Sequence, residues 1–186
     1  MTETAFSGVV EFEVYLLMTM KPRLSLADAR GLLDAKVAEA GLSLEEAGRV
    51  HSRISQVLSD EKSRFRDMKA LLGLDEDGTS LTYSSVLWPG FEFRADADVN
   101  GLLESAAYTH VQRLLRKAES PTELAAWSVD IPEFDARFGP VIRRGSTPFF
   151  DDVLPAYEEY EFSWNGDRYG ARFLWGLFLS SSVYWE

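Results

Sequence analysis

Carboxylates and aromatic side chains alternate in one segment in the last quarter of the sequence. Between residues 149 and 162 there are five acidic residues and no lysine or arginine. Aromatic residues supply much of the contact energy of protein interfaces, and carboxylates attract arginine and lysine. The segment therefore predicts a partner-binding surface, which comprises Asp151, Asp152, Tyr157, Glu158, Glu159, Glu161 and Trp164. The alternative is a solvated face of a hairpin above an aromatic core.

A second acidic segment, residues 96–101, begins like a calcium-binding loop. Its sequence is Asp-Ala-Asp-Val-Asn-Gly, so oxygen-bearing side chains occupy alternate positions before a glycine. That spacing matches the start of an EF-hand loop, but Ala107 replaces the glutamate expected later in the loop. We therefore predict no metal site here. If the segment does bind a cation, the candidate ligands are Asp96, Asp98 and Asn100. The favoured interpretation is an acidic turn in which Asp98 or Asn100 caps a following helix.

Acid–base chemistry has few candidates in this chain. There are two histidines, His51 and His110, and no cysteine, which excludes a three-histidine metal site, disulfides and cysteine nucleophiles. The common serine-nucleophile and nucleotide-binding motifs are also missing from the sequence. We therefore favour a protein without catalytic residues or cofactors, in which His110 is a core histidine bonded to a neighbour. The alternative is a carboxylate- or metal-dependent hydrolase with its site near Asp96, Asp98 and His110.

The formal charge of −11 is distributed unevenly. Residues 21–70 contain ten Lys and Arg against eight Asp and Glu, so the rest of the chain carries the negative excess. A negative field repels nucleic acid and attracts basic proteins. No apolar run reaches the length of about 18 residues typical of a membrane span, and the N-terminal residues do not resemble a signal peptide. The sequence therefore predicts a cytoplasmic protein that binds neither nucleic acid nor membranes.

Hydrophobic periodicity predicts the elements of the first two thirds of the chain. Alternate apolar residues from Phe12 to Met20 predict an N-terminal strand. Serines followed by apolar residues at helical spacing predict a helix over 25–41, and one or two helices over 43–72. The same signals predict two short strands and a helix, at 80–87, 91–94 and 101–118 respectively.

The last third of the chain contains a strong turn signal. Asn165-Gly166 readily supplies the two positive φ angles of a type I′ turn, so a β-hairpin is predicted with arms at 157–164 and 168–179. Before it, Ser120 and Asp130 begin short helical turns, and 141–144 is a possible strand. The predicted fold class is α+β: an N-terminal strand, a helical segment, then short strands and helices that end in an antiparallel hairpin within a mixed or antiparallel sheet. A length of 186 residues suits a single domain, 1–186.

In general character the whole chain resembles the immunity proteins of bacterial toxin systems. Those proteins are small, acidic, cytosolic and frequently α+β, and each blocks a cognate toxin, often a nuclease. The resemblance implies a bacterial protein that neutralises a basic toxin domain by direct binding. It assigns no site residues, because no motif in the chain is specific to one immunity family. The further alternative is a structural component of a phage or a secretion apparatus.

Overall fold

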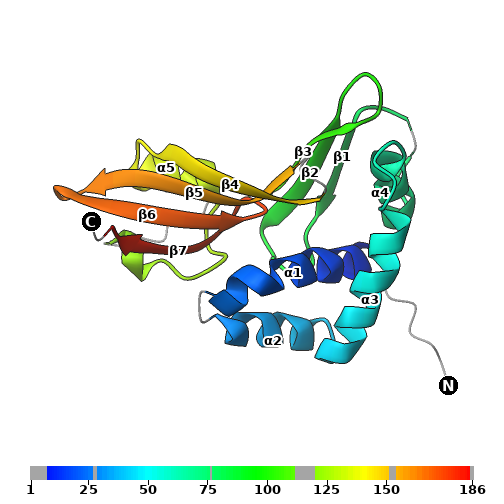
Figure 1. Ribbon diagram of the computed structural model, residues 1–186, viewed down its shortest axis with the longest axis horizontal. Coiled ribbons are helices and arrows are strands. Elements are labelled where there is room, and N and C mark those ends of the chain that lie inside the picture. Colours follow the sequence, from blue (N-terminus) through cyan, green and yellow to red (C-terminus); the bar gives the residue numbers. More distant parts are fainter. Residues whose placement is uncertain (1–7, 27–28, 76, 112–119, 151–153, 185–186) are drawn as a thin grey trace. The chain divides into compact units, whose positions relative to one another are not determined.

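Five α-helices and seven strands make up the described parts of the chain (Figure 1). The computed structural model describes residues 8–26, 29–75, 77–111, 120–150 and 154–184. The helices are α1 (Gly8–Leu26), α2 (Arg30–Glu39), α3 (Leu44–Val57), α4 (Arg64–Leu72) and α5 (Ile131–Phe138), with a 3-10 turn at Pro121–Glu123. The strands are β1 (Ser80–Ser84), β2 (Phe91–Ala97), β3 (Leu103–His110), β4 (Ile142–Phe150), β5 (Leu154–Trp164), β6 (Asp167–Leu174) and β7 (Leu177–Val183). The fold is α+β, as predicted.

Contacts divide the chain into two compact units. One unit comprises residues 1–89 and 96–103, and the other comprises residues 90–95 and 104–186. The strands form a three-stranded sheet in the order β1-β2-β3 and a four-stranded antiparallel sheet in the order β4-β5-β6-β7. The prediction of a single domain over residues 1–186 remains a prediction.

The N-terminal segment is a helix, so the prediction of an N-terminal strand was wrong. Along α1, Phe12, Val14 and Leu16 are buried, and so are the intervening Tyr15 and Leu17. Because apolar residues occupy both sets of alternate positions, their alternation does not distinguish a strand from a helix that is buried on most sides. The length decides the question, since 19 residues far exceed an ordinary strand.

A buried carboxylate, Glu13, joins α1 to the loop after β1. The residue is 0% exposed. Its Oε2 accepts hydrogen bonds from the backbone amides of Val86 (3.0 Å) and Leu87 (2.8 Å). Its Oε1 accepts one from the Ser85 hydroxyl (2.5 Å), whose oxygen accepts the Trp88 amide (2.9 Å). A buried charge is tolerated only when it is compensated in this way, so Glu13 fixes the path of the loop.

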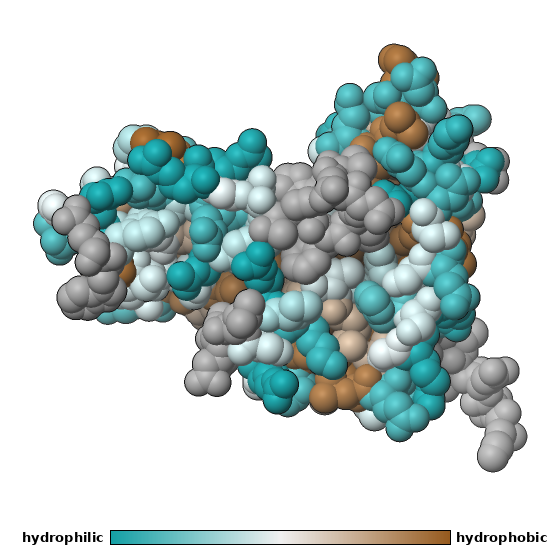
Figure 2. All heavy atoms as spheres, in the orientation of Figure 1, coloured by the Kyte–Doolittle hydropathy of each residue, from teal (hydrophilic) through white to brown (hydrophobic). Residues whose placement is uncertain are grey.

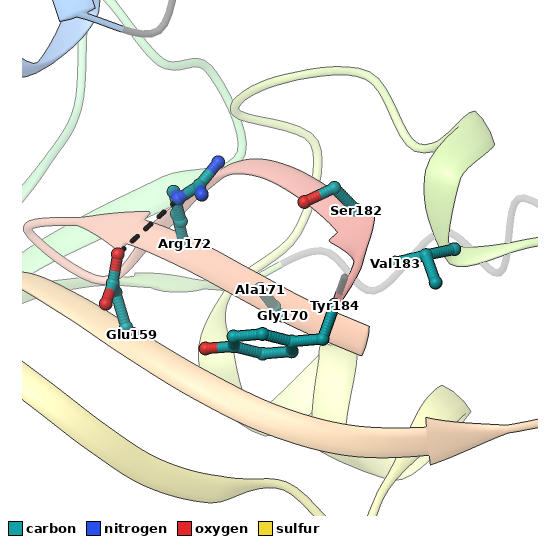
Figure 3. Close-up of a pocket in the computed structure, with 7 residues that line it drawn as sticks. All are labelled: Glu159, Gly170, Ala171, Arg172, Ser182, Val183 and Tyr184. Carbon is teal, nitrogen blue, oxygen red and sulfur yellow. Dashed lines mark ion pairs between the residues drawn. The ribbon is translucent and has the colours of Figure 1, made fainter. Parts of the chain in front are cut away.

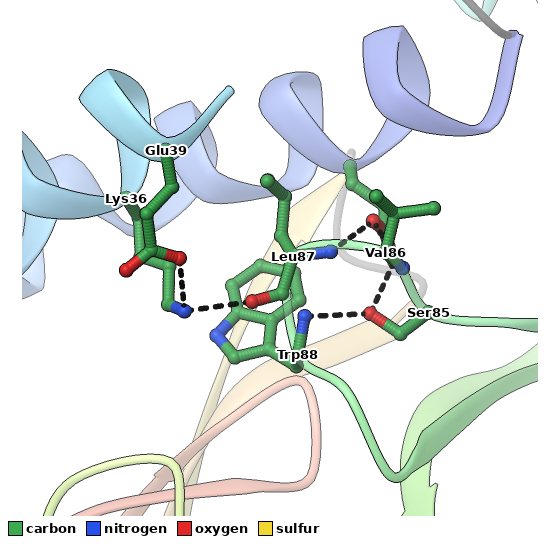
Figure 4. Close-up of polar contacts among 7 residues, drawn as sticks. Lys36, Glu39, Ser85, Val86, Leu87 and Trp88 are labelled. Atoms are coloured by element: carbon green, nitrogen blue, oxygen red, sulfur yellow. Dashed lines mark hydrogen bonds and ion pairs between the residues drawn. The ribbon is translucent and has the colours of Figure 1, made fainter. Parts of the chain in front are cut away.

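Helix α2 holds the same loop through a lysine. The Lys36 ammonium donates a hydrogen bond to the Leu87 carbonyl at 2.7 Å and pairs with Glu39 at 2.6 Å (Figure 4). The α2 helix is shorter than the predicted 25–41, because α1 continues to Leu26.

The segment 43–72 forms two helices rather than one. Helix α3 begins at the predicted capping box, in which the Ser43 hydroxyl accepts the Glu46 amide and the Glu46 carboxylate accepts the Ser43 amide. Helix α4 begins at Arg64 and ends at Gly73, which has a left-handed φ of 66°. Both helix ends therefore follow from local sequence signals.

The predicted helix over 101–118 was wrong where the structure describes it. Leu103–His110 is strand β3, and residues 112–118 lie outside the described residues. The segment is rich in residues that favour helices, but Asn100-Gly101 closes a turn between β2 and β3, with a φ of 80° at Gly101. Strand pairing therefore outweighs intrinsic helix propensity here.

The C-terminal sheet is a meander with two tight turns. Asn165 and Gly166 have φ angles of 51° and 90°, which confirms the predicted hairpin turn. The second arm was predicted too long: Trp175 and Gly176, with φ angles of 49° and 79°, turn the chain again between β6 and β7. The core of this unit is formed by Val129, Phe134, Phe138, Phe162, Ala171, Phe173 and Phe178.

Two glycines allow a test of the turn. We expect Gly166→Ala to destabilise the protein by about 1 kcal/mol, because a side chain at positive φ is strained. Gly48→Ala, inside α3 and with no atom within 4 Å of the new methyl group, should stabilise it by roughly 0.5–1 kcal/mol. Chemical denaturation of both variants would check the signs; a neutral Gly166→Ala would contradict the assigned turn.

The Glu13 contacts give a second prediction. Glu13→Gln replaces one acceptor oxygen by an NH₂ group that faces backbone donors, and should lower the free energy of unfolding by about 2–4 kcal/mol. Glu39→Gln, at an exposed ion pair, should change it by less than about 0.5 kcal/mol. Equal effects of the two substitutions in denaturant titrations would rule out a structural role of the buried carboxylate.

Candidate functional site

The sheet β4–β7 has one face covered by α5 and one face open. Phe134 and Phe138 of α5 pack against Phe162 and Phe173 of the sheet. Because successive strand residues point to opposite faces, the residues between these aromatics point away from α5. We call this second side the open face; it carries Arg144 of β4, Tyr157, Glu159 and Glu161 of β5, Arg168, Gly170 and Arg172 of β6, and Ser182 and Tyr184 at the end of β7.

Both edges of the sheet are poorly suited to pairing with another strand. The outer edge of β7 is bonded to the preceding segment, since the Trp127 amide donates to Phe178 (2.6 Å) and the Phe178 amide donates to Val129 (3.0 Å). On the other side, β4 contains Pro148 and has three irregularities in its register, features that blunt a free edge. The open face is therefore the part of this sheet best suited to contact with a partner.

Glu161 lies at the centre of a three-residue ion-pair cluster on the open face. Its Oε2 is 2.8 Å from the Arg144 Nε, and its Oε1 is 2.9 Å from an Arg168 terminal nitrogen. Hydrogen bonds from Arg144 and then Arg168 hold the pKa of the Glu161 carboxyl below its usual value. The glutamate side chain is only 16% exposed, whereas both arginines are more than half exposed. Both carboxylate oxygens of Glu161 are thus occupied by the protein's own guanidinium groups.

Glu159 lies beside a pocket on the same face (Figure 3). Its Oε1 accepts a hydrogen bond from the Tyr157 hydroxyl and is 3.5 Å from the Arg172 Nε. The pocket has a volume of about 250 Å³, and it is lined by Glu159, Gly170, Ala171, Arg172, Ser182, Val183 and Tyr184. Tyr184 lies across Gly170, where an added Cβ would come within 2.8 Å of its ring. The pocket combines an aromatic ring, a hydroxyl and a loosely paired carboxylate and guanidinium.

Other predicted interface residues lie elsewhere. Glu158 is on the covered face, where its Oε1 pairs with Arg143 at 3.3 Å and accepts the Tyr160 hydroxyl at 3.1 Å. Trp164, also on that face, packs against Phe138 with ring centroids 5.1 Å apart. Asp151 and Asp152 lie outside the described residues. The structure therefore brings Tyr157, Glu159 and Glu161 to one face and separates them from Glu158 and Trp164.

Sequence reasoning did not identify the arginines that pair with these glutamates. Arg168 and Arg172 lie on β6, directly across from β5, and a two-residue turn at Asn165-Gly166 already implies this register. The arginines of β4 were not predictable, because an irregular pairing places them. The glutamates consequently form a mixed-charge surface rather than an unpaired anionic patch.

The calcium-like segment is a self-contained turn. The Asp98 Oδ1 accepts the amides of Asn100 and Leu102, both at 2.8 Å, and the Leu102 bond is the main reason that the Asp98 pKa is lowered. Asp96 accepts the Ser80 hydroxyl at 2.5 Å. Within the ranges that the structure describes, no three His, Asp or Glu side chains are grouped to hold a metal ion. The predicted acidic turn is present, but it leads into strand β3, so the prediction that Asp98 or Asn100 caps a helix was wrong.

His110 lies at the other end of β3 from that turn. Its Nδ1 is 2.7 Å from Glu133 of α5, which is mostly buried and also pairs with Arg137 at 2.6 Å. Its ring stacks on Phe91 at 4.5 Å, and its amide donates to Asp130 at 2.8 Å. His110 is therefore a histidine bonded to a neighbour, Glu133.

The exposed apolar side chains are few and dispersed. Figure 2 shows hydrophilic residues over most of the visible face, with small separate apolar areas. Among the large apolar residues that are exposed, Val183 and Tyr184 border the pocket on the open face. No helix in the described parts of the chain is both long and apolar enough to cross a membrane.

Comparisons with known proteins add no relative. No protein family matches the chain. No curated protein is significantly similar in sequence, and no solved structure is significantly similar in fold.

The covered face offers a test by titration. Burial, together with the neighbouring Glu158 carboxylate, raises the pKa of Tyr160 to about 12. Because the folded pKa is raised, Tyr160 contributes to stability below pH 10 and loses that contribution as the pH rises towards 12. Near-ultraviolet absorbance should show a late tyrosinate step at about pH 12 that is missing in Tyr160→Phe. Loss of a tyrosinate step near pH 10 in Tyr160→Phe, rather than of the late step, would place Tyr160 in solvent instead.

Proposed function

We propose that this chain is a protein-binding module that acts by occupying the surface of a partner protein, as immunity proteins do with their toxins. The open face is the proposed contact surface. The observation that carries the proposal is that Arg168, Arg172 and Tyr184 on this face are exposed, while α5 covers the other face. In addition, β7 is bonded along part of its outer edge and β4 has an irregular register.

The composition of the open face supports this proposal. Arginine and tyrosine are the residues most often found at the energetic centres of interfaces, and Arg172 and Tyr184 border the pocket there. Cross-strand ion pairs hold the guanidinium groups in position before a partner arrives, which lowers the entropy cost of binding. The net charge of −11 favours a basic partner, because it accelerates encounter with a positively charged surface.

The enzymatic alternative has less support. The Asp98 carboxylate accepts hydrogen bonds from backbone amides of its own turn. His110 lies at the other end of β3, where its Nδ1 is bonded to Glu133. A hydrolase built on Asp96, Asp98 and His110 would need these groups to converge on one substrate.

Affinity capture followed by titration would test the proposed function. The tagged chain would be used to isolate its partner from the source cells, and the dissociation constant of the purified pair would be measured. The double variant Arg172→Ala/Tyr184→Ala should bind at least about 100-fold more weakly, because central interface residues typically contribute 2 kcal/mol or more each. Co-expression with a toxic partner should restore growth only with the unmodified chain.

A matched control is available on α3. Arg49 and Val57 are exposed there and lie outside the sheet. The double variant Arg49→Ala/Val57→Ala should retain full affinity. If Arg49→Ala/Val57→Ala loses binding while Arg172→Ala/Tyr184→Ala retains it, the contact surface is not the open face. If no partner is captured and the chain forms a closed oligomer in solution, the result would instead favour a structural component of a phage or a secretion apparatus.

A further inference from the structure

We propose that the pocket on the open face holds one arginine or lysine side chain of the partner, with Glu159 as its acceptor and Tyr184 as its stacking surface. This inference rests on the proposed function. It differs from the expectation of a general anionic patch, because it assigns recognition of the cation to one of the three glutamates of β5.

The three glutamates differ in the acceptor capacity that remains to them. Both oxygens of Glu161 are paired with arginines, and Glu158 lies on the covered face. The Glu159 Oε1 accepts the Tyr157 hydroxyl, but no described residue donates a hydrogen bond to its Oε2. Glu159 therefore has an acceptor oxygen on the open face that an incoming donor can use.

Two glycines lie beside Glu159 and Tyr184, and of these Gly170 lines the pocket. Gly145 of β4 pairs with Glu159, and a Cβ there would lie 3.8 Å from the Glu159 Oε2. Gly170 of β6 leaves room for the Tyr184 ring, which would lie 2.8 Å from a Cβ built there and is itself exposed. A planar guanidinium can stack on such a ring while its N–H groups reach a carboxylate.

The pocket lining carries one carboxylate, Glu159, and one guanidinium, Arg172, so the preference for a cation comes from the open oxygen of Glu159 and from the net charge of the chain. Arg172 contacts Glu159 at 3.5 Å, an ion pair without a hydrogen bond, so it leaves the carboxylate open to a shorter bond of about 2.8 Å from a partner guanidinium. An entering carboxylate would have to approach Glu159 within a protein of net charge −11. The hydroxyl of Ser182 and the guanidinium of Arg172 are the groups that would oppose this preference.

Nuclear magnetic resonance of the full ¹⁵N-labelled chain tests the inference without knowledge of the partner. The probes are N-acetyl-arginine amide, N-acetyl-lysine amide and N-acetyl-glutamate amide. The arginine probe should shift the amide signals of Gly145 and Gly170, with saturation in the millimolar range, and the glutamate probe should not. A stronger response to N-acetyl-glutamate amide would overturn the assignment of a cation.

Three variants separate Glu159 from its neighbours. Glu159→Gln should weaken binding of the arginine probe at least about fivefold, a loss typical of one charge-assisted hydrogen bond. Glu161→Gln should leave it within about twofold. Tyr184→Ala should also weaken binding of the probe, because it removes the proposed stacking surface. Equal binding by Glu159→Gln and the unmodified chain would overturn the inference.

The experiments distinguish a failure of the pocket assignment from a failure of the proposed function. If no probe binds but Arg172→Ala/Tyr184→Ala still loses the partner, the open face is the interface and the assigned role of Glu159 is wrong. If the arginine probe binds as expected but the partner is captured equally well by both double variants, the pocket exists and the interface lies elsewhere.

Discussion

The register between β5 and β6 is the constraint on which the open face depends. The two-residue turn at Asn165-Gly166 pairs Trp164 with Asp167, and the same register places Glu159 opposite Arg172 further along the strands. A slip of β5 by one residue would exchange its two faces, turning Glu159 towards α5 and Phe162 towards solvent. The pairing that buries the aromatic core therefore also decides which charges meet on the surface.

Local signals in the sequence were sufficient for those parts of the fold that short-range chemistry determines. The capping box at Ser43 and the turn at Asn165-Gly166 were predicted because a few adjacent residues satisfy the backbone there. Asn100-Gly101 also closes a turn, with a positive φ at the glycine alone, yet the helix-favouring residues after it concealed strand β3. Helix α1 was missed because its burial on most sides removes the amphipathic pattern by which helices are recognised.

The candidate site was predictable only in part, because charges that are distant in sequence determine its character. The acidic residues of β5 were visible, and the turn register would have added Arg168 and Arg172. Arg144 comes from an irregular stretch of β4 and could not be placed without the structure. Glu158 shows the same limit, because only the position of α5 determines which face of the sheet is covered. Counting charges along the chain therefore predicted their presence but not their pairing.

Overall charge and local pairing act on different steps of recognition. The net charge of −11 acts at long range, so it influences how fast a basic protein arrives and is weakened by salt. The ion pairs on the open face act only at contact, where a wrongly placed charge on a competitor would disturb an arrangement that is already satisfied. A surface whose carboxylates are nearly all paired binds cations in general only weakly. It is better suited to a partner whose basic residue fits the one acceptor oxygen that Glu159 leaves open.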